Sequence, residues 1–379
     1  MSESLKRFLK PLGITAAGLA LLGGLLVVSG IVPVRASSGH WAITRWFLSF
    51  SMARSVSTDS LDVTVPDTLD DPREILRGAG HYQTGCYPCH GNPTTPHPRV
   101  AQAMLPQPPY LPETLDQWEP EELFVIVKHG IKLAGMPAWP AEDRDDEVWA
   151  MVAFLKRYPS LSEEEYGTLV WGDAAPGQGR AALEAAGVVR AHVQTCVRCH
   201  GADGNSRGVG AFPRLAGQHE VYLAEALRAY VSGGRTSGIM EPIAAELTAE
   251  EIDALAAYFT AQTPRGLLTD PEALSPEAVA RGERIARDGA PRRKVPSCVD
   301  CHGPGEAIEN EAYPLLAGQP EEYLRTQLEL FARGARDGSP RANLMHEVAE
   351  NLSEEQMADV AAYYAAESPD GSPDTSSDE

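Results

Sequence analysis

The apolar positions of this chain follow two patterns, and both predict helices. The first is a run of 23 residues without a charged side chain, from Leu12 to Val34, which is long enough to cross a bilayer as a helix. The second recurs in three segments that align without a gap, with apolar residues three to four positions apart and an aromatic residue at the same place: 148–154, 252–258 and 357–363. That spacing puts the apolar side chains on one face of an amphipathic helix.

The apolar run has the flanks of a membrane anchor. Lys6, Arg7 and Lys10 precede it, and Arg35 ends it. A secretory signal has a shorter apolar region, and basic residues stay on the cytoplasmic side. We therefore expect residues 1–36 to be a cytoplasmic start and a single-pass anchor in a bacterial inner membrane, with the rest of the chain on the periplasmic side. A small-residue site at 34–36 leaves removal of the segment open.

Residues 37–71 are expected to be an interfacial helix and a tether. Trp41, Trp46, Phe47 and Phe50 lie close together, and aromatic rings favour the membrane–water interface. A helix lying on the outer surface of the membrane fits this pattern. Contact with a groove of a membrane partner subunit fits it equally well.

The chemistry of the chain is concentrated in one motif. Cys-x-x-Cys-His, followed by glycine, occurs three times and uses all six cysteines. The motif is typical of c-type haem attachment, because two thiols on one turn reach the vinyl groups of one porphyrin and the histidine reaches its iron. A zinc site would need a second ligand pair nearby, and a redox dithiol would not need the histidine. We predict three covalent haem c groups, held by Cys86, Cys89, Cys196, Cys199, Cys298 and Cys301, with His90, His200 and His302 on the irons.

The motifs lie 110 and 102 residues apart, which suggests one small domain for each. We expect the rest of the chain to divide into a haem domain at 72–160, a linker at 161–177, a haem domain at 178–263, a linker at 264–274, a haem domain at 275–367 and a disordered acidic tail at 368–379. The last two domains are internal repeats, since Pro-x-Leu-Ala-Gly-Gln occurs at 213–218 and again at 314–319.

The terminal helices also locate the second axial ligand of each iron. Counting back 18 residues from the aromatic positions Phe154, Tyr258 and Tyr363 gives three methionines: Met136, Met240 and Met345. Methionine opposite histidine raises the potential of haem iron, which suits electron transfer. His346 could compete with its neighbour Met345, although the other domains have no counterpart.

The second ring nitrogen of an axial histidine usually donates to a fixed acceptor. The carbonyl groups of Pro213 and Pro314 are candidates, although prolines in an ordinary turn explain the pattern as well. In the first domain the proline-rich segment 93–109 offers too many acceptors to choose one.

The net charge of the chain limits the kinds of partner that it can bind. The formal net charge of −21 argues against nucleic acid, because binding to phosphates depends on Lys and Arg. It favours a cationic partner, or it reflects solubility alone. Arg292, Arg293 and Lys294 form a basic exception that could dock an acidic partner or be a solvated loop.

These features resemble class I c-type cytochromes, with a glycine in each N-terminal helix (Gly78, Gly179, Gly282), the haem motif, a distal methionine and a C-terminal helix with an aromatic residue. Residues 178–366 resemble the di-haem cytochrome c4 family specifically, through Cys-His-Gly-Ala-Asp-Gly-Asn at 199–205 and the repeated Pro-x-Leu-Ala-Gly-Gln. The resemblance implies an all-α fold, haem attached outside the bacterial inner membrane and electron delivery, often to terminal oxidases. A third haem domain and an anchor depart from that family.

The resulting hypothesis is a membrane-anchored tri-haem relay of a respiratory chain, without catalytic residues, that delivers electrons to a terminal oxidase. The partners would be the oxidase, a soluble cytochrome c or dehydrogenase subunits. An alternative is the cytochrome subunit of a membrane-bound quinoprotein or flavoprotein dehydrogenase. A third hypothesis is an enzyme in its own right, such as a peroxidase or a sulfur-compound dehydrogenase, which needs an iron with a vacant or replaceable position.

Overall fold

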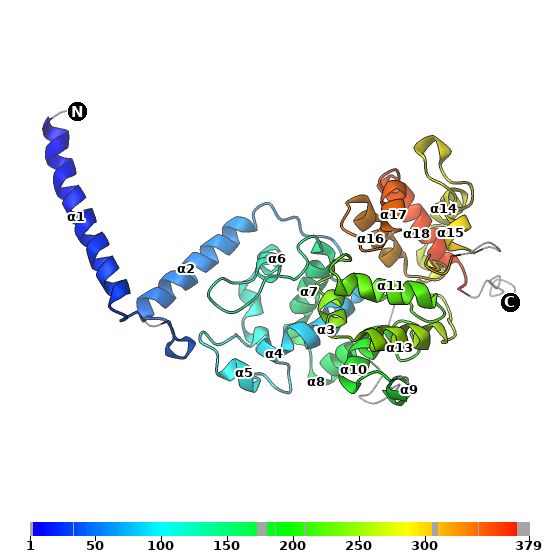
Figure 1. Ribbon diagram of the computed structural model, residues 1–379, viewed down its shortest axis with the longest axis horizontal. Helices are drawn as coiled ribbons and strands as arrows, with labels where there is room; N and C mark the ends of the chain where they lie inside the picture. The colour runs from blue at the N-terminus through cyan, green and yellow to red at the C-terminus, as the bar shows by residue number, and fades with distance from the viewer. Residues whose placement is uncertain are drawn as a thin grey trace.

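The computed structural model describes residues 3–32, 34–172, 180–185, 187–207, 210–304, 310–339 and 341–369. Within these ranges the regular structure is helical, and extended backbone pairs only as isolated bridges. Figure 1 shows a long N-terminal helix that projects away from a body of packed helices. The prediction of an all-α chain is therefore confirmed for the part of the chain that is described. Gly179 and residues 370–379 of the predicted tail lie outside it.

The projecting helix, α1 (Glu3–Val28), contains the predicted apolar run. Its segment Pro11–Val28 is long and apolar enough to cross a membrane, and none of it is buried against the rest of the chain. A membrane anchor and a signal sequence share these properties, so the choice between them stays a prediction.

The next helix, α2 (Ala42–Asp59), contains the predicted interfacial segment but runs further than expected. Trp46 and Phe50 stack on each other and remain exposed. At the other end of the helix, Val56 is buried in the core of the following helices. The end of α2 is therefore held by apolar packing on the helices that follow.

The first group of helices surrounds the first Cys-x-x-Cys-His motif. It comprises α3 (Pro72–Gly85), α4 (Tyr87–His90), α5 (Arg99–Gln102), α6 (Pro120–His129), α7 (Asp145–Arg157) and α8 (Glu163–Trp171). Helix α3 crosses α7 closely, and a Cβ atom at Gly78 would lie 2.2 Å from the Ala150 carbonyl oxygen. Glycine permits this crossing because it has no side chain.

Helix α8 corrects the predicted linker 161–177. Tyr166 and Val170 on this helix are buried in the core of the first group. Ser162 caps the helix by accepting from the backbone N–H of Glu165. Residues 161–171 therefore pack as part of the first group, and residues 173–177 lie outside the described chain.

The second and third groups hold the other two motifs. The second comprises α9 (Arg180–Ala185), α10 (Arg190–His200), α11 (Glu220–Val231), α12 (Met240–Ala244) and α13 (Ala249–Thr260). The third comprises α14 (Pro276–Asp288), α15 (Val299–His302), α16 (Glu321–Ala332), α17 (Ala342–Ala349) and α18 (Glu354–Ala366). Each group has its own clusters of buried apolar residues. The division into three domains with the stated boundaries stays a prediction.

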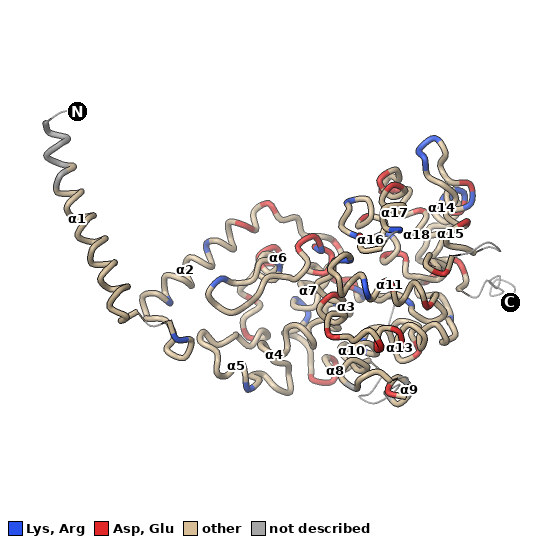
Figure 2. Tube along the Cα trace, in the orientation of Figure 1, with Lys and Arg blue, Asp and Glu red and all other residues tan. Residues whose placement is uncertain are grey.

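Short 3-10 turns connect the helices. They are η1 (Ala36–Ser38), η2 (Leu111–Glu113), η3 (Leu115–Gln117), η4 (Tyr158–Ser160), η5 (Pro271–Ala273) and η6 (Pro291–Arg293). Figure 2 shows the basic loop at η6 on the chain between α14 and α15, while Asp and Glu are spread over many helices. Arg292 and Lys294 are exposed there, and Arg293 donates to Gln356.

Candidate haem-binding sites

Each motif histidine is oriented by a proline carbonyl group. The Nδ1 atom lies 2.9 Å from the Pro109 oxygen for His90, 3.1 Å from Pro213 for His200 and 2.8 Å from Pro314 for His302. The predicted acceptors in the two repeats are confirmed, and Pro109 is the one that the sequence could not single out. Because Nδ1 donates to a carbonyl, the other nitrogen, Nε2, is the one that can bind a metal.

Burial prepares these imidazoles for coordination. It lowers the pKa of His90, His200 and His302, although the carbonyl acceptors act in the opposite direction. A lower pKa keeps the ring neutral, and only a neutral ring has a lone pair for iron. The three rings are therefore withdrawn from solvent and favoured in the neutral form, which is the form that a metal ligand needs.

The cysteine pairs lie beside these rings, at the short turns α4 and α15 and in the last part of the longer helix α10. The glycine after each histidine, such as Gly91 with φ 72°, ends the turn in a backbone conformation that favours glycine. Burial raises the pKa of the Cys86 and Cys196 thiols to about 12 and that of Cys298 to about 11. Among the described residues, no group of three or more His, Cys, Asp or Glu side chains is arranged to hold a metal ion. Neutral thiols without further donors suit covalent attachment better than zinc binding.

The second motif faces a cavity of about 240 Å³. Cys196, Cys199 and His200 line it on one side, and Met240 at the start of α12 lines it on another. Apolar side chains cover much of the remainder, among them Phe212, Leu215, Ile243, Leu255 and Phe259. The structure thus brings together all four residues that the sequence assigned to the second iron and its porphyrin. An apolar cavity between an imidazole and a thioether fits a haem group.

At the first motif, His90 and Met136 are each held by contacts of their own. Met136 lies in a loop closed by a hydrogen bond from the Ile131 N–H to the Met136 carbonyl, 3.1 Å long. Met104 approaches the same loop, since its methyl group would be 3.2 Å from a Cβ atom on Gly135.

At the third motif, Met345 lies on α17 and packs against the cluster of Phe331, Ala342 and Ala349. His346 lies beside it. Its Nδ1 atom is 2.7 Å from the Phe331 carbonyl, as in the motif histidines, and its Nε2 atom is 3.7 Å from Glu350, which is longer than a hydrogen bond. His346 therefore stays a candidate beside Met345.

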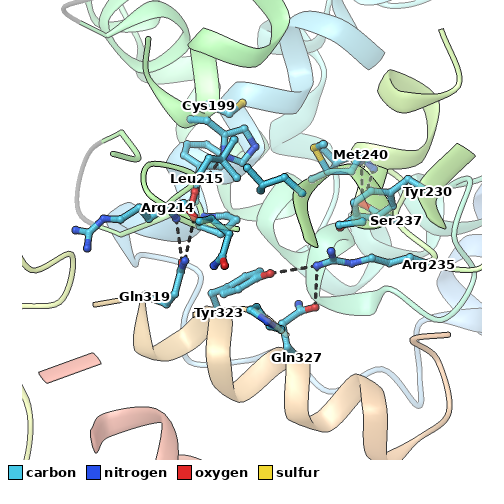
Figure 3. A pocket seen from close by; sticks show the side chains of 18 of the residues that line it. Cys199, Arg214, Leu215, Tyr230, Arg235, Ser237, Met240, Gln319, Tyr323 and Gln327 are labelled. Atoms are coloured by element: carbon cyan, nitrogen blue, oxygen red, sulfur yellow. Dashed lines mark hydrogen bonds between the residues drawn. The ribbon is translucent and has the colours of Figure 1, made fainter. Parts of the chain in front are cut away.

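The two repeats exchange hydrogen bonds next to their motif histidines. Gln319 accepts from the Arg214 N–H and donates to the Arg214 carbonyl, at 3.0 and 2.9 Å (Figure 3). Gln218 makes the same pair of bonds to Leu315, at 2.9 and 3.0 Å. Because residues 214 and 315 each follow the proline that orients a histidine, each repeat supports the histidine loop of the other.

Two arginines complete this interface, Arg235 buried and Arg336 half-buried, and the sequence pattern singled out neither of them. Arg235 donates to Tyr323 and Gln327 (Figure 3), while Arg336 donates to Gln327 and Tyr222. Within the described ranges, no carboxylate lies at ion-pair distance from either guanidinium group. A signal was present, since each arginine follows the glutamine of its repeat by 17 residues.

The arginines also affect the neighbouring phenol. Burial alone would raise the pKa of Tyr222, but the charges of Arg336 and Arg235 lower it to about 8. A buried cation without an anionic partner is costly, so the surroundings of Arg235 are suited to receive a carboxylate. The propionate groups of a porphyrin have that chemistry.

Imidazole, thioether and paired thiols around an apolar cavity define a c-type cytochrome. The profile of the family described as "Cytochrome C oxidase, cbb3-type, subunit III" matches residues 73–155 and 182–259, and that of "Cytochrome c" matches residues 279–365. The thiosulfate dehydrogenase electron acceptor of Thiomonas intermedia is 35% identical over 218 residues, which are 57% of this chain and 94% of that protein.

Cytochrome c4 of Pseudomonas aeruginosa is 35% identical over 193 residues, or 51% of this chain and 87% of that protein. The solved cytochrome c4 structure of Acidithiobacillus ferrooxidans matches with 35% identity and a TM-score of 0.39, covering 45% of this chain and 98% of that one. The chain belongs to the di-haem cytochrome c4 family, and it carries one more Cys-x-x-Cys-His motif than two haem groups need.

Proposed function

We propose that this protein is an electron carrier with three covalent haem c groups. Haem c supplies an iron that alternates between the ferrous and ferric states. The observation that carries the proposal is the second site, where Cys196, Cys199, His200 and Met240 line one cavity. The other two motifs repeat its histidine geometry, with Nδ1 held by a proline carbonyl in each.

The residues of the chain would hold the groups and keep their ligation constant. His90, His200 and His302 would present Nε2, and the register of the terminal helices assigns the opposite ligand to Met136, Met240 and Met345. Apolar walls such as Phe212 and Phe259 exclude water, which favours the less charged state of the centre and raises its potential. With a histidine and a methionine held for each iron, these residues would suit a centre that transfers electrons rather than one that binds a substrate.

The arginines of the interface add a route between two sites. Arg235 and Arg336 approach each other from the second and third groups through an isolated backbone bridge. Carboxylates bound there would belong to porphyrins of both groups and would bring their edges together. Electrons would then pass between the second and third sites within the protein.

Membrane attachment belongs to the same proposal. Helix α1 would hold the protein on the periplasmic side of a bacterial inner membrane, and the exposed aromatic residues of α2 would lie in the interface. Its length, composition and full exposure support this role.

Two kinds of partner are supported by the relatives. The family matched by the first two groups is named for a subunit of a cbb3-type oxidase, which supports delivery to a terminal oxidase. The relatives in Thiomonas intermedia and Stutzerimonas stutzeri are electron acceptors of thiosulfate dehydrogenase, which supports a dehydrogenase as the donor. The two roles are compatible, because a carrier needs both a donor and an acceptor.

The test is a pair of stopped-flow measurements on the detergent-purified protein. Ferric protein is mixed with thiosulfate and a thiosulfate dehydrogenase, and ferrous protein is mixed with a cbb3-type oxidase and oxygen. A carrier changes oxidation state at all three haems in at least one of these reactions. A protein that keeps its oxidation state with both partners while remaining redox-active with small mediators would contradict the assignment of these partners.

A further inference from the structure

The loop that carries Met240 is held by a residue of another group of helices. Glu147, in the first turn of α7, is 3% exposed. Its Oε1 atom accepts from the Ser237 hydroxyl at 2.5 Å, and its Oε2 atom accepts from the Gly238 N–H at 2.6 Å. A carboxylate of the first group is thus bound to two residues just before the methionine of the second.

Ser237 passes this contact on to the methionine itself. Its Oγ atom accepts from the Met240 N–H at 2.9 Å and from the Ile239 N–H at 3.2 Å. A chain of hydrogen bonds therefore runs from Glu147 through the hydroxyl to the backbone of Met240 (Figure 3 shows the serine and the methionine). Since hydrogen bonds to a charged acceptor are stronger than neutral ones, the carboxylate fixes where α12 begins.

Neighbouring residues of the first group fix the carboxylate in turn. Arg144 forms an ion pair with it at 2.9 Å and donates to the Thr236 carbonyl at 2.9 Å. Trp139 donates to Glu147 at 3.1 Å. The indole also packs on the loop, because a Cβ atom at Gly238 would lie only 2.1 Å from its Nε1 atom. The contact between Glu147 and the loop before Met240 is direct and buried, and both carboxylate oxygens accept hydrogen bonds.

We propose that Glu147 is a positioning residue for the second haem site, through which the first group of helices holds the methionine of the second group on its iron. The inference rests on the proposed ligation by Met240. Glu147 acts through Ser237 and touches neither iron nor sulfur in this arrangement. Removing the contact would loosen the methionine at that haem alone.

The test is displacement of methionine by imidazole in the ferric, full-length protein. Loss of the methionine–iron charge-transfer band reports displacement, with one phase of the titration for each haem. The phase that is missing in Met240→Ala is assigned to the second haem. Glu147→Gln places an amide N–H₂ among donors, and Ser237→Ala removes the relay. Each variant should raise the imidazole affinity of that phase roughly tenfold, which is the loss expected for one charge-assisted hydrogen bond. The double variant should add little, since both substitutions break one chain.

Asp145→Asn is the matched control, because it removes a charge from the same turn but from a carboxylate paired with Lys128. It should leave all phases unchanged, and the phases of the first and third haems should not move in any variant. If both Glu147→Gln and Ser237→Ala stay within about twofold of the wild type, the positioning role is overturned. If Met240→Ala removes no phase, the ligand assignment fails instead, which is a separate result from failure at Glu147.

Discussion

Replacing Gly282 by alanine should destabilise the third group of helices. Helix α14 crosses α18 at this glycine, and an added Cβ atom would lie 1.9 Å from the Asp359 carbonyl oxygen and 2.9 Å from the Tyr363 Cβ. Cβ atoms essentially never approach closer than 3.0 Å, so the helices must separate by about 1 Å. Overpacking of this kind costs about 1–3 kcal/mol, while alanine regains about 1 kcal/mol of helix propensity. The clashing atom belongs to the backbone and cannot rotate away, so the cost should lie at the upper end of that range and the net loss should be roughly 2 kcal/mol.

The crossing matters for the haem site because α14 also anchors the third motif. The Cys298 N–H donates to the Ala286 carbonyl at 2.8 Å. The assay is denaturant unfolding of the holoprotein, followed by haem absorbance and far-ultraviolet circular dichroism. Gly167→Ala is the control, since nothing lies within 4 Å of a Cβ atom there, and it should be neutral or stabilising. A Gly282→Ala protein as stable as the wild type would refute the reasoning about the crossing.

Three further predictions follow from the sites. Met136→Ala and Met345→Ala should each lower the potential of one haem and let carbon monoxide bind one ferrous iron, whereas the wild type should bind none; an unchanged spectrum and titration would remove that methionine from the ligand set. Arg235→Gln should lower the potential of a haem at the interface by roughly 60 mV, equivalent to about a tenfold change for one electron, and an unmoved potential in a redox titration would contradict a role beside propionates. Burial alone would raise the pKa of Asp146, but hydrogen bonding and the charge of Arg144 lower it to about 2. The folded pKa of Asp146 therefore lies below the ordinary 3.8. Asp146→Asn should lower the free energy of unfolding most above about pH 4, and this loss should vanish as the pH falls toward 2. If denaturant titrations show the same loss at every pH, the result would argue against the lowered pKa.

The parts that the sequence could predict are those that covalent chemistry or periodicity fixes. The spacing of Cys196, Cys199 and His200 is set by the porphyrin, and the register from Tyr258 back to Met240 is set by the helix that follows. The structure places these residues on one cavity. The acceptor role of Pro213 could be anticipated because it lies within reach along the chain.

Helix α8 could have been predicted but was not. Its first turn consists of Glu163, Glu164 and Glu165, and this run resembles a solvated linker. The capping serine and the apolar residues Tyr166 and Val170, four positions apart, were the signals for a packed helix.

The contacts between groups could not be predicted from one sequence. Glu147 and Ser237 are 90 residues apart, and each is an ordinary polar residue in its local pattern. Only the packing of α7 on the Met240 loop makes the carboxylate buried and gives it a partner. The same applies to Arg235 and Tyr323, whose positions become meaningful once the two repeats face each other.

The central claim is that three haem groups are covalently held by this chain, and the mass of the intact protein tests it most directly. The purified protein should exceed the mass of its mature polypeptide by three haem groups, with one group on each peptide that contains Cys86, Cys196 or Cys298. A mass equal to that of the polypeptide alone, or one raised by fewer than three groups in protein made with a complete haem-attachment system, would contradict the account.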